Sequence, residues 1–418
     1  MSDVFPEELL LQILVRLSVK ALLLCRSVCK SWCLLISSSH FINSHIRHNH
    51  AVGNHNLLLR CFSNNQEKEI YTLHDEIDSL KTIRELVFPF DKPQGDFFTV
   101  VGCVNGLICL WDDTHELNPV TLWNPALQKS FRVPSLHYSM SDDGPLACQK
   151  LAFGFGFDAL ANDYKILRIA FTFAHFIKNR RIDRRPLSFL SKIGVCSADI
   201  FSLSTKSWRH INTSVPLQQL SIPVFVNGAL HFLTSKDGNQ FVVVSFDLNA
   251  EAFVEMACPP DAKLGTHLDQ RIVASSETIS LLHQRHEHLY DIWVMKKYNV
   301  AESWIRLFSI DLDMSLGWKR ILGFSGNGGL MLVGSGSWVG YPIVNAIQIV
   351  DFQPLGSYCA PYAETYMETL ALLQDDNTIT HLQQNIGGAV QDHKRRGQEI
   401  RRVAGKRRGK SARVSLTH

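Results

Sequence analysis

The sequence lacks the features of a secreted or membrane protein. Its ten cysteines are scattered and mostly flanked by apolar residues, as Cys109 is by Ile108 and Leu110, which is typical of small buried side chains in a reducing compartment. No uninterrupted apolar run stands near the beginning, because Glu7 and Glu8 open a stretch that polar residues break repeatedly. We therefore expect a cytoplasmic or nuclear protein without a membrane partner.

The sequence also lacks the signatures of an enzyme, such as a nucleophile elbow, a phosphate-binding loop or paired carboxylates in an apolar context. Three cysteines four residues apart are expected to pack on one helix face: Cys25, Cys29 and Cys33. Three histidines without a completing carboxylate or cysteine are expected in a polar loop: His283, His286 and His288. These patterns predict no catalytic residue, no cofactor and no metal.

The charge of the chain is low and uneven. The net charge is +3, yet residues 391–418 hold ten Lys or Arg against two acidic residues, which leaves the preceding part near −5. That part has no basic signature of nucleic-acid binding. The tail could be a nuclear-localisation signal, a nucleic-acid contact or an extension without function. Its basic clusters are Lys394, Arg395, Arg396, Lys406, Arg407 and Arg408.

Residues 6–46 predict three or four short helices. Pro6 suits a helix start, and Glu7 and Glu8 then lie at the positive end of the helix dipole. Apolar residues recur at helical spacing, with further sets around Trp32 and Phe41. A unit of this size cannot bury all of these apolar side chains. Part of the apolar surface must therefore face either the rest of the chain or a partner.

The order of residues in this stretch resembles the F-box of plant proteins. The matching segments are Pro6 to Leu10, Ile13 to Leu17, Val19 to Leu22, Arg26 to Trp32, Leu35 to Ile36 and His40 to Ile42. Phe5 and Ser18 depart from the usual leucine and proline, although Ser18 can cap a helix. The resemblance implies binding to a Skp-type adaptor and, through it, to a cullin. The residues implied at that contact are Pro6, Leu9, Leu10, Ile13, Leu14, Leu17, Leu22, Val28 and Trp32.

After residue 57 the apolar pattern changes from helical to alternating, and the polar residues 47–56 before it predict a linker. Two near copies centre on Asn105-Gly106 and Asn227-Gly228. Each predicts a two-residue hairpin with a type I′ turn, because Asn-Gly readily adopts the positive φ angles that this turn needs.

A pair of aromatic-bearing strands recurs about every 45 residues along the later copies. The copies are Trp123 with Phe131, Phe201 with Trp208, Phe246 with Phe253, and Trp293 with Trp304. The wider first gap predicts one more copy at Phe153 to Ile169. This period is typical of a β-propeller blade and predicts about six to eight blades over residues 57–374, whereas a β-sandwich gives no reason for such a repeat.

This region resembles the kelch-like F-box-associated domain of plant proteins, including the S-locus F-box group. The matching segments are Asn105 to Leu107, Leu122 to Pro125, Phe153 to Asp158, Asp163 to Lys165, Val224 to His231, Phe246 to Leu248 and Ile292 to Lys296. The resemblances together imply an α+β multidomain chain with an F-box at 1–46, a linker at 47–56, a propeller-like domain at 57–374 and a basic disordered tail at 375–418.

The resemblance implies a non-catalytic substrate receptor of a Skp-cullin-F-box ubiquitin ligase, whose β domain binds an unidentified target protein. Two alternatives stay open: an adaptor-bound regulator without a ligase role, and a propeller enzyme with polar groups of shifted pKa in its central channel. A basic stretch at 178–192 falls where a blade would need a long connection. We expect it either to bind an acidic partner surface or to be a plain solvated loop. Its candidate contacts are Arg180, Arg181, Arg184 and Arg185.

Overall fold

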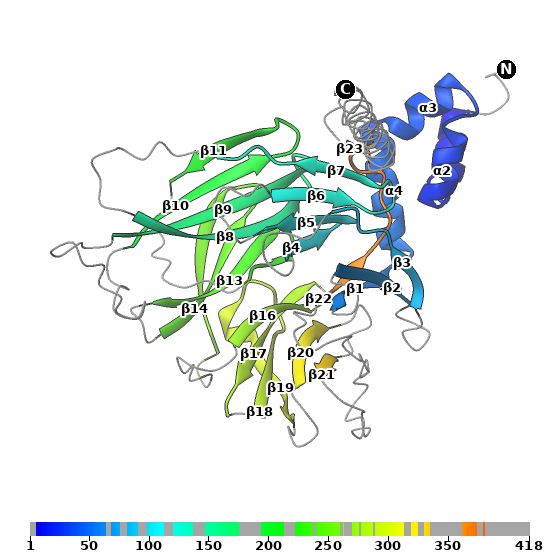
Figure 1. The fold of residues 1–418 in the computed structure, drawn as a ribbon. Coiled ribbons are helices and arrows are strands. Elements are labelled where there is room, and N and C mark those ends of the chain that lie inside the picture. The colour runs from blue at the N-terminus through cyan, green and yellow to red at the C-terminus, as the bar shows by residue number, and fades with distance from the viewer. Residues whose placement is uncertain are drawn as a thin grey trace, which may run out of the picture.

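Four helices stand at one end of a ring of β-sheets (Figure 1). The computed structural model describes residues 6–63, 68–75, 82–90, 98–112, 120–136, 147–174, 194–212, 222–236, 240–259, 262, 270–275, 277–286, 289–312, 319–324, 330–334, 362–373 and 379–380. The helices are α1 (Glu7–Leu14), α2 (Val19–Cys25), α3 (Lys30–Ser37) and α4 (Ser39–Ala51), which confirms the predicted three or four helices.

Local sequence explains where these helices begin. Pro6 is the N-cap residue of α1, and both residues that follow it in the first turn are acidic. The Ser18 hydroxyl accepts a hydrogen bond from the Ala21 amide at 3.3 Å, so this serine caps α2. Ser38 caps α4 in the same way through the Phe41 amide at 3.1 Å.

Helix α4 extends into the stretch predicted as a linker, and this part of the prediction is wrong. Residues 47–51 are helical, and β1 begins at Asn56. His45 and Asn49 are buried and lie 3.3 Å apart between the Asn49 amide nitrogen and His45 Nδ1. The polar composition that suggested a linker therefore belongs to a helix whose polar side chains partly face inward.

The β region consists of short antiparallel strands. They are β1 (Asn56–Ser63), β2 (Lys68–His74), β3 (Thr82–Leu86), β4 (Thr99–Val104), β5 (Leu107–Trp111), β6 (Val120–Asn124), β7 (Lys129–Arg132), β8 (Ala147–Asp158), β9 (Asp163–Ala174), β10 (Gly194–Ser202), β11 (Ser207–Ile211), β12 (Val224–Val226), β13 (Ala229–Lys236), β14 (Gln240–Asp247), β15 (Ala252–Ala257), β16 (Gln270–Ser275), β17 (Thr278–Gln284), β18 (Leu289–Met295), β19 (Trp304–Asp311), β20 (Lys319–Phe324), β21 (Leu330–Gly334), β22 (Tyr362–Tyr366) and β23 (Ile379–Thr380).

The strands form sheets that follow one another around a centre. The sheets are β22-β1-β2-β3, β4-β5-β6-β7-β23, β8-β9-β10-β11, β12-β13-β14-β15, β16-β17-β18-β19 and β20-β21. The first strand of each sheet contacts the first strand of the next, and β20 contacts β22 again, so these strands close a ring. Since β22 pairs with β1, strands from opposite ends of the β region share one sheet.

Apolar clusters lie between neighbouring sheets. One joins the β4–β7 sheet to the β8–β11 sheet through Leu107, Leu122 and Phe155. Equivalent clusters occupy the other junctions, including a small one in which Leu57 and Leu59 of β1 meet Met331 of β21. Each sheet is thus covered by its neighbours, which is the packing of a β-propeller.

The sheets of the ring differ in their number of strands. Five sheets have four or five strands each, whereas the sheet of β20 and β21 has two strands within the described ranges. The β-propeller fold is therefore observed, and the predicted number of six to eight blades stays a prediction.

The two Asn-Gly hairpins have the predicted turn. Val104 pairs with Leu107 and Val226 with Ala229, which leaves two-residue loops. Asn105 has a φ of 46° and Gly106 of 78°, and the second copy has nearly the same values. Positive φ at both positions confirms the type I′ turns.

The aromatic repeat corresponds to the third and fourth strands of four successive sheets. Phe201 pairs with Trp208 across β10 and β11, and Phe246 pairs with Phe253 across β14 and β15. The prediction of an extra copy at Phe153 to Ile169 is wrong, because β8 and β9 are the first two strands of the same sheet as β10 and β11. The gap is wide because β8 and β9 have twelve residues each, and because 14 residues precede β8 and 19 residues separate β9 from β10.

Candidate docking surface and central cavity

The helical unit, α1 to α4, has an outer surface rich in exposed apolar side chains. These are 47% to 72% exposed and comprise Leu9, Ile13, Leu24, Val28 and Leu34. Pro6 is exposed beside them. Five large apolar side chains stay exposed on this one unit of four short helices, so its outer surface is a candidate docking site.

The structure divides the predicted adaptor contacts between two sides of the helices. Pro6, Leu9, Ile13 and Val28 are exposed. Leu10, Leu17 and Trp32 are partly buried, whereas Leu14 and Leu22 are 1% and 0% exposed. The last two residues form the interior of the unit, which makes them unsuitable as direct contacts. Sequence reasoning missed Leu24 and Leu34, although three consecutive leucines at 22–24 cannot all face one side of a helix.

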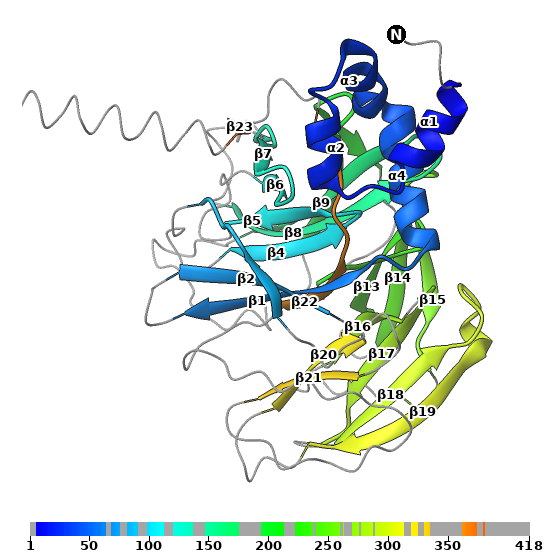
Figure 2. The ribbon, with the colours of Figure 1, turned by 90° about the vertical axis from the view of Figure 1, so that its right-hand side faces the viewer.

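The inner side of the helices packs on the β region. Its cluster contains Leu14, Leu22 and Phe41 together with Leu370 and Leu373. Ala126 and Leu127, from the turn between β6 and β7, pack against this cluster. The alternative that the apolar stripe packs on its own chain is therefore correct for this side, and Figure 2 shows the helices seated at the end of the ring.

Residues 367–373, the strap, lie between the helices and the ring. The Asn124 side chain donates to the carbonyls of Thr369 at 3.0 Å and Ala371 at 2.8 Å. Lys129 Nζ donates to the Leu373 carbonyl at 3.0 Å. A Cβ on Gly106 would lie 2.2 Å from the Met367 carbonyl oxygen, so the β4–β5 turn approaches the strap more closely than a side chain permits. The strap is thus fixed to the ring, and its leucines reach the helices.

A buried histidine fixes the helices to one another. His45 is 1% exposed, and its Nε2 donates to the Leu17 carbonyl at 3.0 Å. Burial lowers the pKa of His45, although the bond to Leu17 acts in the opposite direction. The imidazole is therefore neutral near neutral pH and links α4 to the α1–α2 turn.

The other predicted cysteine and histidine groups are arranged differently from expectation. Cys25 ends α2, Cys29 precedes α3 and is exposed, and Cys33 lies within α3, so the expectation that all three pack on one helix face is wrong. His283 is buried in β17 rather than in a polar loop. Among the residues that the structure describes, no group of three His, Cys, Asp or Glu could hold a metal ion.

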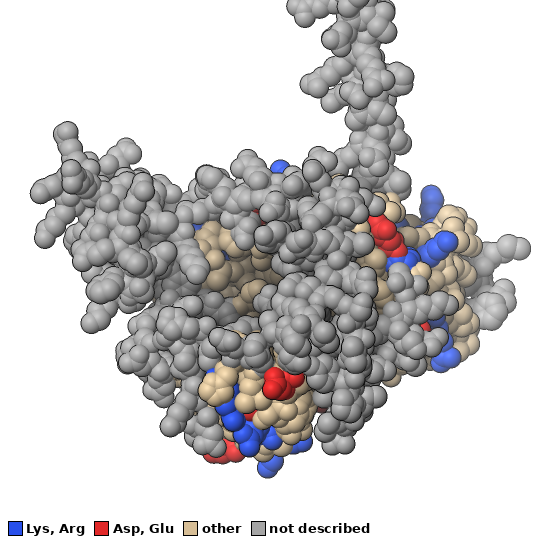
Figure 3. Space-filling view, turned by 60° about the horizontal axis from the view of Figure 1, so that its bottom comes forward, with Lys and Arg blue, Asp and Glu red and all other residues tan. Residues whose placement is uncertain are grey.

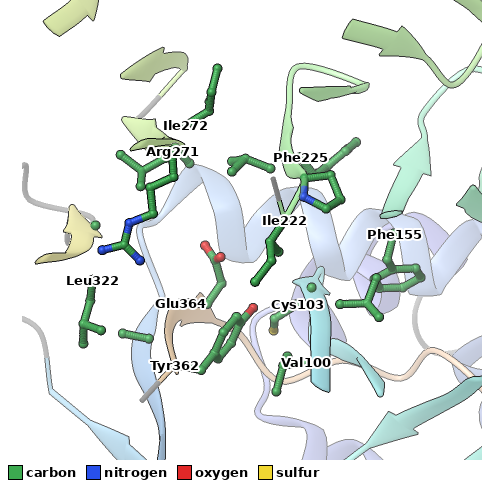
Figure 4. Close-up of a pocket in the computed structure, with 18 of the residues that line it drawn as sticks. Val100, Cys103, Phe155, Ile222, Phe225, Arg271, Ile272, Leu322, Tyr362 and Glu364 are labelled. Atoms are coloured by element: carbon green, nitrogen blue, oxygen red, sulfur yellow. The ribbon is translucent and has the colours of Figure 1, made fainter. Parts of the chain in front are cut away.

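A second candidate site is a cavity of about 410 Å³ at the centre of the ring. Residues from β4, β8, β12, β16, β20 and β22, the strands that close the ring, line it. Most of the wall is apolar, and Figure 4 shows Val100, Phe155, Phe225, Ile272 and Leu322 around the space. The propeller geometry itself creates this cavity, because the inner strands converge there.

Polar groups converge on one part of the cavity wall. Tyr362 and Glu364 come from β22, and Cys103 comes from β4 (Figure 4). Burial raises the pKa of the Cys103 thiol and of the Tyr362 phenol, and the Glu364 carboxylate raises both further. Because both groups stay protonated near neutral pH, neither is an activated nucleophile. The expectation of a non-catalytic protein stays a prediction.

The two arginines in the cavity wall make bonds to the chain itself. Arg60 Nε lies 3.0 Å from Glu69 Oε2, and both side chains are almost fully buried. The Tyr71 hydroxyl donates to the same carboxylate oxygen at 2.9 Å. Arg271 donates to the Ile321 carbonyl in β20. These bonds hold strands together next to the cavity.

Several predicted features lie outside the described residues. They include the basic loop residues Arg180, Arg181, Arg184 and Arg185 and the basic tail clusters at 394–396 and 406–408. On the described surface in Figure 3, basic and acidic side chains appear together. Within the described ranges, the helices are too short or too polar to cross a membrane.

Comparisons with known proteins agree with this architecture. Residues 57–328 match the sequence profile of the F-box associated beta propeller domain, and residues 3–46 match the F-box-like profile. The F-box protein At3g07870 of Arabidopsis thaliana is 29% identical over 76% of this chain and 75% of its own length. The F-box protein CPR1 of the same plant is 26% identical over 74% of each chain.

Proposed function

Because this chain belongs to the family of F-box proteins with an F-box associated β-propeller domain, we propose that it is a substrate receptor of a Skp-cullin-F-box ubiquitin ligase. The outer surface of α1 to α3 docks a Skp-type adaptor, which joins the chain to a cullin. The β-propeller binds a target protein. The chain performs no bond chemistry and acts by holding a target lysine near the ubiquitin-charged enzyme, which raises their effective concentration.

One observation carries this proposal: the helices expose large apolar side chains while their opposite side is fixed to the ring. Leu9, Ile13, Leu24, Val28 and Leu34 remain exposed on the folded unit. Burying one such side chain contributes about 1.5 to 3 kcal/mol. A few of them are therefore enough to drive a helix-in-groove contact with an adaptor.

The adaptor contact is tested by the double substitution Leu9→Glu and Ile13→Glu. Both side chains are exposed, so the helices should stay folded while two carboxylates disrupt the apolar contact. We expect capture of a purified Skp-type adaptor to fall at least a hundredfold, because each buried charge without a partner costs several kcal/mol.

The matched control is Val87→Glu, which places the same charge on an apolar residue that is 68% exposed in the β region. Unchanged adaptor capture by the double variant, with the control also unchanged, would contradict the proposed surface. Leu14 is unsuitable for this test, because a carboxylate at its buried position would unfold the helices.

The same double variant separates a ligase receptor from an adaptor-bound regulator. A receptor that cannot reach the adaptor still holds its target, so targets should accumulate in complex with the variant and be identified by mass spectrometry. Depletion of the wild-type chain should slow the turnover of those targets. If turnover of every captured protein is unaffected, the regulator alternative is favoured instead.

A further inference from the structure

We infer that Leu370 and Leu373 of the strap are positioning residues for the adaptor contact, so that the helices bind the adaptor tightly only when the strap is docked against them. Both leucines are buried in the inner cluster of the helices. They therefore act through the helices and not by touching the adaptor. This inference rests on the proposed function and makes the adaptor contact depend on a segment more than 330 residues further along the chain.

Each of the first three helices separates an inner apolar side chain from an outer one. Successive residues turn by about 100° around a helix, so residues two apart lie on nearly opposite sides. The pairs of inner and outer side chains are Leu14 and Ile13 in α1, Leu22 and Leu24 in α2, and Ile36 and Leu34 in α3. The thickness of one helix thus separates the strap from a docked adaptor.

The three helices are too short to be stable without packing. They have eight, seven and eight residues, whereas isolated helices shorter than about 12 to 15 residues are marginal in water. The buried part of their inner cluster contains five side chains from the helices, and its other two members are Leu370 and Leu373. The outer surface therefore keeps its shape because the strap completes the inner one.

The strap has one side on the ring and the other on the helices. Ala371 and Leu372 belong to the apolar cluster between the β4–β7 and β8–β11 sheets. The Leu373 amide donates to the Leu370 carbonyl at 3.0 Å, and Leu372 within this turn has a φ of 68°. A bulky residue adopts positive φ only where its surroundings impose it. The turn thus lets Leu370 and Leu373 reach the helices while Leu372 packs on the ring.

The strap also makes the helices sensitive to closure of the ring. It directly follows β22, the strand that pairs with β1, and Figure 2 shows the chain running from this strand to the helices. Coupling between two sites is reciprocal. If the docked strap raises the adaptor affinity of the helices, then a bound adaptor must hold the strap more firmly in place.

The double variant Leu370→Ala and Leu373→Ala of the full chain tests the first direction. We expect the dissociation constant for a purified Skp-type adaptor, measured by calorimetry, to rise at least about tenfold. The shortened side chains leave a cavity under the helices, and the apparent affinity falls with the population of their ordered state. The double Leu→Met variant nearly conserves the volume and should keep an affinity closer to that of the wild-type chain.

The matched control is the double variant Leu282→Ala and Leu330→Ala. These two leucines are equally buried, but their cluster contains no residue of the helices. The control should bind the adaptor as the wild-type chain does. Amide protection in the β12–β15 sheet verifies that the ring of each variant is folded.

Hydrogen exchange of the wild-type chain tests the other direction. At an adaptor concentration about a hundred times its dissociation constant, exchange in residues 367–373 should slow at least about tenfold, because the adaptor favours the docked state of the strap. Exchange in β17, which is remote from the helices in the ring, should not change.

The wild-type chain distinguishes a failure of this inference from a failure of the proposed function. If the wild-type chain does not bind the adaptor, the proposed function is wrong, and this inference is wrong with it. If the adaptor binds but exchange of the strap is unchanged at saturation, the inference is overturned while the proposed function stands. An unchanged dissociation constant in the folded double Leu→Ala variant of the strap would overturn it equally.

Discussion

The helical unit and the β-ring solve the problem of burying apolar surface in opposite ways. In the ring every sheet is covered by its neighbours, and apolar clusters occupy each junction. The helices have a single cluster, and it is completed by Leu370 and Leu373 of the strap. Their outer surface stays uncovered. The ring therefore covers its own apolar surface, whereas the helices are covered by the strap on their inner side and leave apolar side chains exposed on their outer side.

The largest effect should come from Leu22→Ala, which removes a fully buried side chain of the helical unit. A buried Leu→Ala substitution costs about 2 to 5 kcal/mol because it leaves a cavity. We expect amide hydrogen exchange to accelerate throughout α1 to α4 while protection in the ring is unchanged. Leu24→Ala, on the same helix but 69% exposed, should change stability by less than about 0.5 kcal/mol. An equal loss of protection in the ring would contradict the separation of the two apolar interiors.

The second-largest effect should be a loss of stability of the ring at acid pH. His231 is buried, and its Nε2 lies 3.1 Å from the Tyr298 hydroxyl. Burial lowers the pKa of His231 to about 4 from its ordinary value of 6.5. Since the unfolded chain binds this proton more readily, the stabilisation is present above pH 6.5 and is lost as the pH falls through 4. The loss should reach about 3 kcal/mol.

Denaturant titrations at several pH values check this expectation. His231→Gln should have a flatter dependence of unfolding free energy on pH between 6.5 and 4 than the wild-type chain. The exposed His40→Gln variant should keep the wild-type dependence. Parallel curves for all three proteins would contradict a role of His231 in acid sensitivity.

A smaller effect is expected from a substitution that weakens the coupling between the helices and the ring. Asn124→Ala removes both hydrogen bonds to the strap and leaves buried carbonyls without donors, which should cost about 1 to 3 kcal/mol. We expect faster hydrogen exchange in residues 367–373 and in the helices. Asn249→Ala, at an exposed turn, is the control. A loss of protection confined to the β4–β7 sheet would show that the strap does not couple the regions.

Features set by neighbouring residues could be predicted from the sequence. The Asn-Gly turns, the cap at Ser18 and the paired aromatic strands depend on residues close in the chain. The division of the helical leucines could not be predicted in the same way. Leu14 and Leu22 are interior because Leu370 and Leu373 lie against them, more than 340 residues away. Helical periodicity identifies apolar residues, but the position of a distant segment decides which of them are covered.

The wrong prediction of an extra copy at Phe153 shows what the spacing of aromatic residues does not determine. Spacing alone could not distinguish an additional sheet from two long strands with long connections, because both account for the same gap. The central cavity was also not visible in the sequence beforehand, since its polar groups come from β4 and β22, about 260 residues apart. Only closure of the ring brings Cys103 close to Tyr362 and Glu364.

The pairing of β22 with β1 has a consequence for the order of events during synthesis. The helices leave the ribosome before the ring does, but the leucines that complete their interior are at 370 and 373, directly after the strand that closes the ring. Domains usually fold as they emerge from the N-terminus. Here the helices must wait for β22 and the strap, which are made after most of the ring, so a nascent chain exposes both sides of its helices until the ring closes.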